Sequence, residues 1–341
     1  MDSQTFHQEP TDQGIEISFD FFQARVLGRE PVVWAIDAFP DRFGLHTKTA
    51  SVLRELFPES EIHPVYVLSE EAFTDRGFTA FLKPALKPMA IKAINSLLEE
   101  TQCFDFRKPR VLIERSASRP ACARKLLRYT KKIGAGHIVL GSHARRGLTR
   151  FLSGSFSEEI LDYSPVPIII AGPQTKIVST PPTDVIFATD FSPGCAFGFT
   201  QILNMAASLN ADLHLFHKES AADIELEPIS TSGMEMFGSG WVSLESYIDQ
   251  HSSDYRLDAD ECSRRAKDAG VTTHLIIQNF REPTSQAIVE YAETLQAARP
   301  ETSAVIAMVS QTGPVASAFL GSVTRDVIRA SPFPVYLAPR L

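Results

Sequence analysis

The sequence has few cysteines, no long apolar run and no excess of basic charge. Its four cysteines, Cys103, Cys122, Cys195 and Cys262, include no Cys-x-x-Cys pair, so we expect free thiols in a reducing compartment rather than a disulfide framework. No apolar run approaches the roughly 18 to 20 residues that cross a bilayer. The first residues also lack a basic segment followed by an apolar core. We therefore expect a cytoplasmic protein without a membrane span.

Several functional signals are also absent. The net charge of −8 argues against a nucleic-acid partner and favours simple solubility. No Gly-x4-Gly-Lys-(Ser/Thr), Gly-x-Gly-x-x-Gly or Gly-x-Ser-x-Gly motif occurs. His214 and His217 invite a metal interpretation, but their odd spacing in an expected strand points them to opposite faces. We assign no catalytic or metal-binding residue.

The most informative stretch that is present covers residues 136–171, GHIVLGSHARRGLTRFLSGSFSEEILDYSPVPIIIA. Its first apolar run, residues 137–140, is typical of a buried parallel strand. Gly141, Ala144 and the pair Gly154-Ser155 follow, and Phe156 opens an apolar-periodic segment. Small residues at a strand end and a helix start let backbone N–H groups approach an anion, which the helix dipole also favours. The pattern predicts a loop that binds a phosphate chain.

This spacing resembles that of the universal stress proteins, whose nucleotide-binding members carry Gly-x2-Gly-x9-Gly-(Ser/Thr) after the fourth strand of an open α/β sheet. Gly141, Gly154 and Ser155 match, as does the flanking GSHARRGL text, but Ala144 replaces the second glycine. If that position needs a positive φ or contact closer than a Cβ permits, alanine weakens binding. The resemblance implies an adenine nucleotide as ligand, ATP or AMP, with or without Mg²⁺.

A second part of the expected site lies at the end of the first strand. Residues 32–36 are apolar and are followed by Asp37, which places a carboxylate at the C-terminal edge of the sheet, where open α/β folds bind ligands. The resemblance implies that Asp37 lies against the adenosine and that backbone near Val67 lies beside the adenine. The alternative for Asp37 is a loop or helix-capping role.

The loop residues have two interpretations as well. Arg145 and Arg146 add positive charge that phosphate binding would use, and His143 is placed to contact a phosphate, but all three are equally compatible with a solvated loop. Gly141 and Gly154 are also compatible with a tight turn and close helix–strand packing. The predicted nucleotide site comprises Asp37, Val67, Gly141, His143, Ala144, Arg145, Gly154, Ser155 and Phe156.

The pattern repeats in the second half. Residues 321–338, GSVTRDVIRASPFPVYLA, align with residues 154–171 at six identical positions of 18, including Ser-Pro-x-Pro before the last strand. Proline there suits an edge strand. The second half keeps Gly321-Ser322, but Met308 and Gln311 stand where nucleotide-binding members have small residues. We interpret this half as a degenerate copy, in which Asp190 is a structural turn residue.

These observations predict an α/β chain of two tandem Rossmann-like or flavodoxin-like domains, each an open, mainly parallel five-stranded sheet with helices on both faces. We expect an N-terminal extension over residues 1–30 with an extra edge strand near residues 15–21, a first domain over 31–172 and a second over 183–341. Residues 172–182 form the expected linker, a helix begins near Met89, and an inserted loop covers residues 218–240. The resemblance implies that the domains form an internal pseudo-dimer through residues 168–171 and 335–338, and a homodimer of chains stays open.

Three functional hypotheses follow from the sequence. The first is a stress-response or signalling protein that binds an adenine nucleotide in its first domain without rapid turnover. The second is a slow ATP hydrolase, for which no residue that positions the water is identified. The third is a scaffold that has lost both sites and acts through protein contacts.

Overall fold

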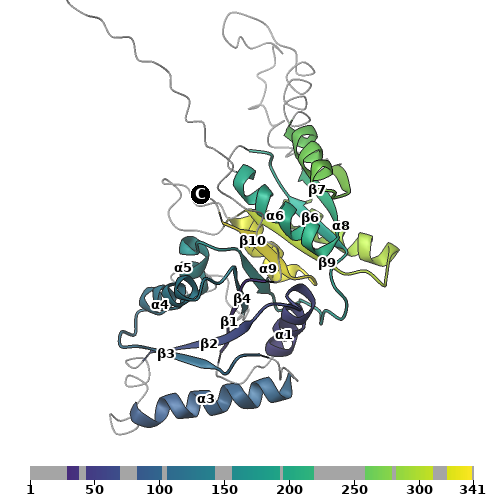
Figure 1. Ribbon diagram of the computed structural model, residues 1–341. Helices are drawn as coiled ribbons and strands as arrows, with labels where there is room; N and C mark the ends of the chain where they lie inside the picture. The colour runs from purple at the N-terminus through teal and green to yellow at the C-terminus, as the bar shows by residue number, and fades with distance from the viewer. Residues whose placement is uncertain are drawn as a thin grey trace, which may run out of the picture.

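The computed structural model describes residues 29–37, 44–69, 83–101, 106–142, 156–192, 195–218, 258–278, 282–309 and 321–339. The strand expected near residues 15–21 lies outside the described residues, as does the loop expected over 218–240 apart from its first residue. Each half of the chain alternates strands and helices, as the sequence predicts (Figure 1).

The first half contains five strands and the helices that connect them. Their bounds are β1 (Val32–Ala35), α1 (Leu45–Leu56), β2 (Ile62–Ser69), α3 (Lys83–Glu100), β3 (Arg110–Glu114), α4 (Arg119–Lys132), β4 (His137–Gly141), α5 (Phe156–Tyr163) and β5 (Ile168–Ala171). The second half follows the same rhythm after the linker. Its elements are β6 (Asp184–Ala188), α6 (Ala196–Leu209), β7 (Asp212–Lys218), a helix over residues 258–268, β8 (Thr273–Gln278), α8 (Thr284–Ala298), β9 (Ala304–Val309), α9 (Ser322–Ala330) and β10 (Val335–Ala338).

The ten strands among the described residues form one sheet, in the order β3-β2-β1-β4-β5-β10-β9-β6-β7-β8. Neighbouring strands within each half are parallel, whereas β5 and β10 are antiparallel, with Tyr336 opposite Ile169. The predicted contact between the two last strands is therefore confirmed. Because the two halves run in opposite directions, the C-terminal edge of one half lies beside the N-terminal edge of the other.

Helices cover both faces of this sheet. On one face, a continuous apolar cluster joins α1, α3, α6 and the helix over 258–268 to the strands. On the other face, a second cluster joins α4, α5, α8 and α9 to the strands. Both clusters cross from one half to the other, and the last strands contribute to them from opposite sides, Tyr336 to the first and Leu337 to the second. The alternation of buried side chains along β10 thus ties the halves together on both faces.

Local sequence explains most element boundaries. Pro120 lies in the first turn of α4, where its missing N–H is not needed, and Gly134 follows that helix with φ of 65°, which glycine adopts without strain. The predicted start of α3 at Met89 is wrong, because the helix begins at Lys83 and contains Pro88. Leu86 and Ala90 flank that proline and are buried against the sheet, so tertiary packing keeps the helix continuous there.

The expectation of an edge position for the last strands needs a similar correction. Pro167 and Pro334 precede β5 and β10, and their carbonyl oxygens accept backbone hydrogen bonds from Ile138 and Ile306. Each strand is the last in its own half, but the two pair with each other at the centre of the ten-stranded sheet. The prolines are tolerated because they precede the paired residues instead of interrupting them.

Candidate functional site

The strand order of the first half has a switch point, which is a candidate ligand site at the C-terminal edge of the sheet. The chain runs from β1 to β2 and β3 on one side, and then returns to place β4 on the other side of β1. In open α/β sheets, ligands bind where the strand order reverses in this way, outside the carboxyl ends of the strands. The switch point of the first half therefore lies between the ends of β1 and β4.

Three predicted residues are brought together at this edge. Ala35 of β1 pairs with Val65 of β2 and with Leu140 of β4. Toward the C-terminal edge of the sheet, Gly141 therefore lies one residue beyond this row of paired residues, and Val67 lies two residues beyond it. Asp37 lies two residues beyond Ala35, the last residue of β1, and is partly buried. The three predicted residues from β1, β2 and β4 thus share one sheet edge, although they are far apart in the sequence.

His46 is part of this edge, and the sequence analysis missed it. Its Nε2 donates a hydrogen bond to the backbone carbonyl of Asp37 at 3.0 Å, and its ring lies 6.5 Å from that of Trp34. His46 is buried in the first turn of α1, which Gly44 begins in a left-handed conformation with φ of 63°. No motif marks a histidine nine residues after Asp37, so only the tertiary contact reveals that it holds the Asp37 backbone.

Gly141 has a packing role that needs no ligand. A Cβ at this position would lie 2.6 Å from Cγ of Leu45 and 3.2 Å from Oγ1 of Thr49. Glycine therefore allows α1 to approach β4 closely. The alternative interpretation of Gly141, close helix–strand packing, has direct geometric support.

The remaining predicted residues surround the start of α5. Phe156 is the first residue of that helix and is partly buried. His143, Ala144, Arg145, Gly154 and Ser155 lie outside the described residues. Ser142 donates its backbone N–H to the carbonyl of Ala171 at 2.8 Å, which fixes the first residue after β4 against the end of β5.

The equivalent edge of the second half is filled by its own side chains. A Cβ on Gly198 of α6 would meet Cγ2 of Val309, at the end of β9, at 2.4 Å. Phe191 is buried with φ of 55°, and its ring lies 5.4 Å from that of His217. Lys218 ends β7 and donates a hydrogen bond from Nζ to the carbonyl of Glu282. The described side chains at this edge therefore pack against one another and form internal hydrogen bonds.

Asp190 occupies the position of Asp37 in the second half. Its Oδ1 accepts hydrogen bonds from the backbone N–H of Ser192 at 3.0 Å and from Sγ of Cys195 at 3.1 Å. Burial by itself raises the pKa of this carboxyl, but these hydrogen bonds outweigh burial and hold the pKa below its usual value. The interpretation of Asp190 as a structural turn residue agrees with these contacts.

Each half also contains a cluster of a carboxylate, a histidine, a tyrosine and an arginine. In the second half, His214 donates from Nε2 to Oδ1 of Asp184 at 3.0 Å, and its Nδ1 lies 2.8 Å from the hydroxyl of Tyr291. Arg299 donates to the same carboxylate. The matching cluster of the first half contains Glu61, His63, Arg107 and Tyr129, with His63 Nδ1 3.0 Å from the Tyr129 hydroxyl.

The two clusters differ in exposure. The side chain of Asp184 is 1% exposed and that of Glu61 is 39% exposed. His214 and His217 have separate partners, since His217 donates from Nδ1 to the carbonyl of Thr189. Within the described ranges, no group of three His, Cys, Asp or Glu residues could hold a metal ion.

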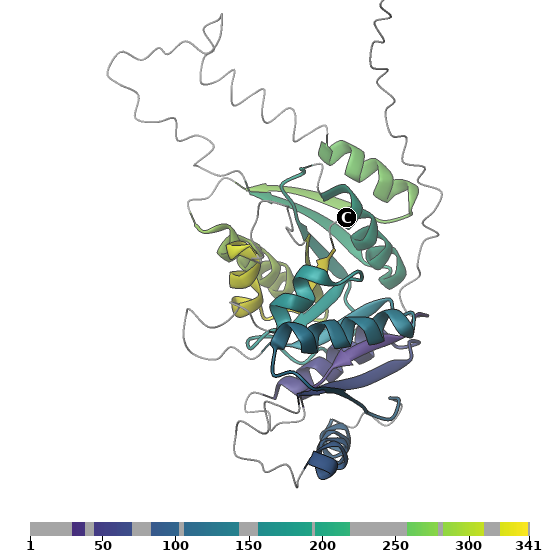
Figure 2. The ribbon, with the colours of Figure 1, turned by 90° about the vertical axis from the view of Figure 1, so that its left-hand side faces the viewer.

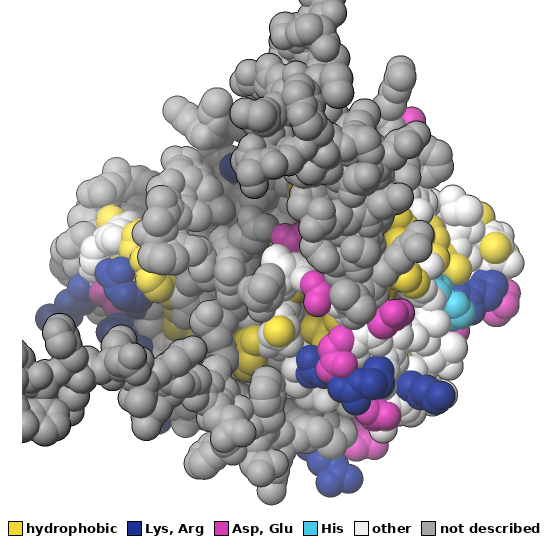
Figure 3. All heavy atoms as spheres, turned by 90° about the horizontal axis from the view of Figure 1, so that it is seen from above, with side chains coloured by type: hydrophobic (Ala, Val, Ile, Leu, Met, Phe, Trp, Pro, Cys, Tyr) yellow, Lys and Arg dark blue, Asp and Glu magenta, His cyan; other side chains and the backbone are white. Residues whose placement is uncertain are grey.

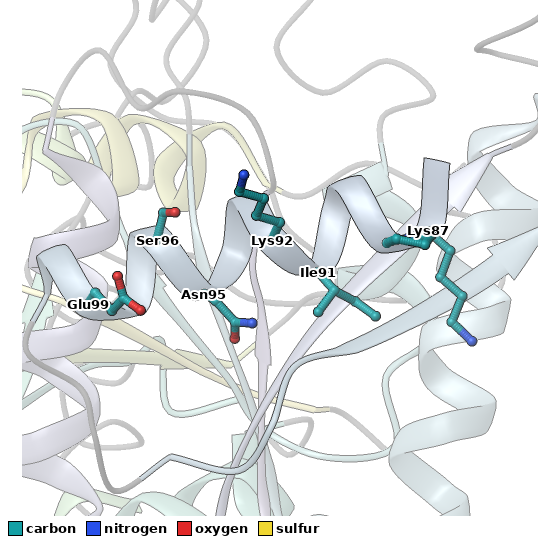
Figure 4. Close-up of a pocket in the computed structure, with 7 residues that line it drawn as sticks. Lys87, Ile91, Lys92, Asn95, Ser96 and Glu99 are labelled. Carbon is teal, nitrogen blue, oxygen red and sulfur yellow. The ribbon is translucent and has the colours of Figure 1, made fainter. Parts of the chain in front are cut away.

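Two surface concavities occur elsewhere. One, of about 680 Å³, lies along α3, and the close-up shows its lining side chains leaving a single helix in different directions (Figure 4). The other, of about 270 Å³, lies between the linker and the N-terminal ends of β9 and β10 and includes Lys176, Glu301 and Phe333. Neither contains a predicted site residue.

The cysteine thiols and the apolar character of the helices also bear on the possible functions. Cys122, Cys195 and Cys262 are free, and burial raises the pKa of Cys262 to about 11, which lowers its thiolate content and hence its reactivity. Among the described helices, none is both long enough and apolar enough to cross a membrane.

Comparison with solved structures finds the same fold. A universal stress protein from Archaeoglobus fulgidus DSM 4304 is 17% identical, with a TM-score of 0.56 over 92% of this chain and 97% of that chain. A functionally unknown protein from Pseudomonas aeruginosa PAO1 is 14% identical, with a TM-score of 0.52 over 91% of this chain and 93% of that one. The universal stress protein from Archaeoglobus fulgidus in complex with dAMP is 15% identical and has a TM-score of only 0.30, over 46% of this chain and 97% of its own.

Comparison with curated proteins found no significant match. The model of the universal stress protein family matches twice, at residues 29–172 and 183–339. These two matches cover most of the chain and correspond to the two halves of the sheet. The chain therefore belongs to the universal stress protein family and carries two of its repeats in tandem.

Proposed function

We propose that the protein binds an adenine nucleotide, ATP or AMP, at the C-terminal edge of its first half. The observation that carries this proposal is the position of Asp37, Val67 and Gly141 around the switch point between β1 and β4. Membership of a family with nucleotide-binding members, as the sequence resemblance implies, supports the choice of ligand.

The described residues fit the adenosine end of such a ligand. Asp37 places a carboxylate at the strand end, where it is able to accept hydrogen bonds from ribose hydroxyls or from the adenine amino group. Backbone near Val67 offers hydrogen-bonding groups beside a flat base. His46 fixes the Asp37 backbone through a 3.0 Å hydrogen bond, which limits the freedom of that strand end.

The phosphate end is assigned from the sequence pattern. Gly154 and Ser155 precede α5, which begins at Phe156, and the first N–H groups of a helix favour an anion. His143, Ala144 and Arg145 belong to the same segment after β4, and Mg²⁺ accompanies the phosphates if ATP is the ligand. We further propose that residues 31–172 hold this site and that residues 183–341 do not, because Met308 and Gln311 replace small residues of the motif there and Asp190 is held within its own turn.

Calorimetric titration of the purified full chain with Mg-ATP, and separately with AMP, tests the proposal. The expected result is one site per chain, after any nucleotide carried through purification has been measured and removed. Two equal sites would contradict the assignment to one half. The absence of both binding heat and copurified nucleotide would overturn the proposal and favour a scaffold, whereas phosphate release on long incubation would indicate a slow ATP hydrolase.

A further inference from the structure

Helix α4 and the neighbouring strand β3 carry a concentration of positive charge on a protein that is acidic overall. Residues 107–132 include one acidic residue, Glu114, and ten basic ones. Those ten are Arg107, Lys108, Arg110, Arg115, Arg119, Arg124, Lys125, Arg128, Lys131 and Lys132. We call this set the α4–β3 basic surface.

Most of these cations have no acidic partner among the described residues. Arg107 pairs with Glu61, Arg124 with Glu159 at 3.4 Å, and Arg128 with Glu114 at 4.0 Å. Six others take part in no ion pair within the described part of the chain. They are Lys108, Arg115, Arg119, Lys125, Lys131 and Lys132, and all but the partly buried Lys125 are exposed.

The equivalent helix of the second half has the opposite charge. Helix α8 contains Glu290 and Glu293 and no Lys or Arg, although it covers the same face of the sheet as α4. The asymmetry extends to the halves, since residues 31–172 contain 20 Lys and Arg against 15 Asp and Glu, and residues 183–341 contain 10 against 20. Because α4 and α8 occupy equivalent positions in the repeated fold, the fold itself does not require α4 to be basic.

The surface is an exposed ridge. In Figure 1, α4 lies on the outside of the first half beside α5 and the edge strand β3. Figure 2 views the molecule from that side and shows α4 in front of the sheet. Seen from above, the described side chains on that side include a group of Lys and Arg beside hydrophobic and a few acidic side chains, whereas the opposite side mixes both signs of charge (Figure 3). The 14 residues of α4 span about 21 Å, which corresponds to about six base pairs of a nucleic-acid duplex.

The chemistry of the surface favours phosphate groups over other anionic partners. Arginine outnumbers lysine by six to four, and its planar fork matches phosphate oxygens. An interfacial membrane helix also presents an apolar face to the lipid, but the apolar face of α4, which includes Leu126 and Leu127, is buried against the sheet. A protein partner normally requires an apolar, weakly charged interface core, which these cations do not provide.

We propose that the α4–β3 basic surface binds the sugar–phosphate backbone of a nucleic acid without reading its sequence. The acidic second half repels the same polyanion and so orients the molecule with its first half toward it. The net charge of −8 conceals this surface because it averages two halves of opposite sign. The surface uses none of the residues assigned to the adenine nucleotide, so the two proposals fail or succeed separately.

The test measures fluorescence anisotropy of labelled 24-base-pair DNA, the matching RNA duplex and the single strands as the full chain is added. The test variant replaces four exposed cations without ion pairs, Arg115→Gln, Arg119→Gln, Lys131→Gln and Lys132→Gln. Binding by the wild type should be micromolar at 50 mM salt and weaken steeply with added salt. The variant should bind at least about tenfold more weakly, and its slope of log K against log salt should fall by about 3 to 4.

A matched control removes the same charge from the second half through Arg264→Gln, Lys267→Gln, Arg325→Gln and Arg329→Gln. The control changes the net charge by the same amount without altering the α4–β3 basic surface, so it should keep wild-type affinity and salt slope within about twofold. It also breaks the exposed ion pairs of Arg264 with Glu261 and Asp268 and of Arg329 with Asp326. Melting curves of both variants establish that they are folded. No binding to any nucleic acid at 50 mM salt, equal losses in the two variants, or binding only to vesicles that contain anionic lipid would each overturn the proposal.

Discussion

The two halves of this chain have the same strand order but differ in what they place at equivalent positions. The first half places Asp37 two residues after β1 and holds its backbone through His46. The second half binds the Asp190 carboxylate within its own turn through Ser192 and Cys195. The second half also buries its carboxylate–histidine cluster, which the first half leaves half-exposed. The two halves thus share a framework, but different side chains hold the equivalent strand ends.

The largest expected effect concerns the buried cluster. Asp184→Ala leaves Arg299 and His214 without their carboxylate in a site where Asp184 is 1% exposed. We expect a loss of about 3–5 kcal/mol in the free energy of unfolding, because the buried His214 and the Thr183 hydroxyl lose their hydrogen-bond acceptor and the partly exposed Arg299 loses its ion-pair partner. Urea denaturation measures the change. The matched variant Glu61→Ala in the first half should cost much less, and equal losses would show that exposure does not distinguish the clusters.

The same carboxylate predicts a pH dependence. Burial raises the pKa of Asp184, but hydrogen bonds from His214 and Thr183 and the charge of Arg299 outweigh it and lower the pKa below 3.8. A group whose folded-state pKa is depressed stabilises the protein above its unfolded pKa, and this contribution is lost as pH falls through the folded value. Unfolding free energies measured from pH 5 downward should therefore decrease, and Asp184→Asn should show a shallower decrease. If the free energy of unfolding of Asp184→Asn fell with pH as steeply as that of the wild type, Asp184 would not be the source of the pH dependence.

The next largest effect should distinguish the glycine–serine pair before α5, Gly154-Ser155, from the equivalent pair before α9, Gly321-Ser322. Gly154→Val should weaken nucleotide binding by at least about 100-fold, because a side chain there removes several N–H contacts to phosphate that contribute about 1.5–3 kcal/mol each. Titration calorimetry measures the loss, with circular dichroism as a check on folding. The control is Gly321→Val, since a Cβ at Gly321 would meet no atom within 4 Å in the described structure. A Gly154→Val variant with unchanged affinity would overturn the phosphate-loop assignment.

A smaller effect is expected for the histidine that positions Asp37. His46→Gln removes or lengthens a neutral hydrogen bond to the Asp37 carbonyl, which typically contributes about 1 kcal/mol. We expect the Kd for AMP to rise about fivefold. His217→Gln removes the comparable bond to Thr189 in the second half and should leave the Kd unchanged. If both variants lost affinity equally, the effect would reflect general stability instead of the first-half site.

The smallest effect concerns the position where this chain departs from the family motif. Ala144→Gly should tighten binding by up to about fivefold or leave it unchanged, because glycine accepts backbone conformations and close contacts that alanine resists at about 1 kcal/mol. The comparison of Kd values for AMP decides between these outcomes. A clear loss of affinity would show that Ala144 suits a different ligand.

Much of the fold was predictable because its signals are local. The apolar runs before Asp37 and Gly141 mark strands, and the repeated Ser-Pro-x-Pro segments mark two equivalent last strands. The start of α3 was not predictable, since Pro88 is a boundary signal that the buried neighbours Leu86 and Ala90 override. Helix propensity is a weak predictor of where a helix begins when the side chains concerned become buried against a sheet.

The candidate site was predictable only in part, for a similar reason. Asp37 was predicted because an apolar run places it at a strand end, Gly141 because of the small-residue spacing, and Val67 because of the family resemblance. The structure places all three at one edge of the sheet, and their role in binding stays a prediction. His46 was not, because its role depends on the approach of α1 to that edge, and the packing of Leu45 on Gly141 became visible only with the helix in place. The clusters around His63 and His214 escaped notice because their members come from different elements, up to 115 residues apart in the case of Asp184 and Arg299.

The sequence by itself determined the repeat, the order of strands and helices, and the family, because hydrophobic periodicity and small-residue spacing are properties of neighbouring residues. The tertiary structure decided that the ten described strands form one sheet through β5 and β10 and that α6 packs closely on the end of β9. It also decided that one carboxylate–histidine cluster is buried while its counterpart is exposed. The burial of a side chain depends on which residues, distant in the sequence, pack against it. Those contacts form only when the sheet and its two layers of helices are assembled.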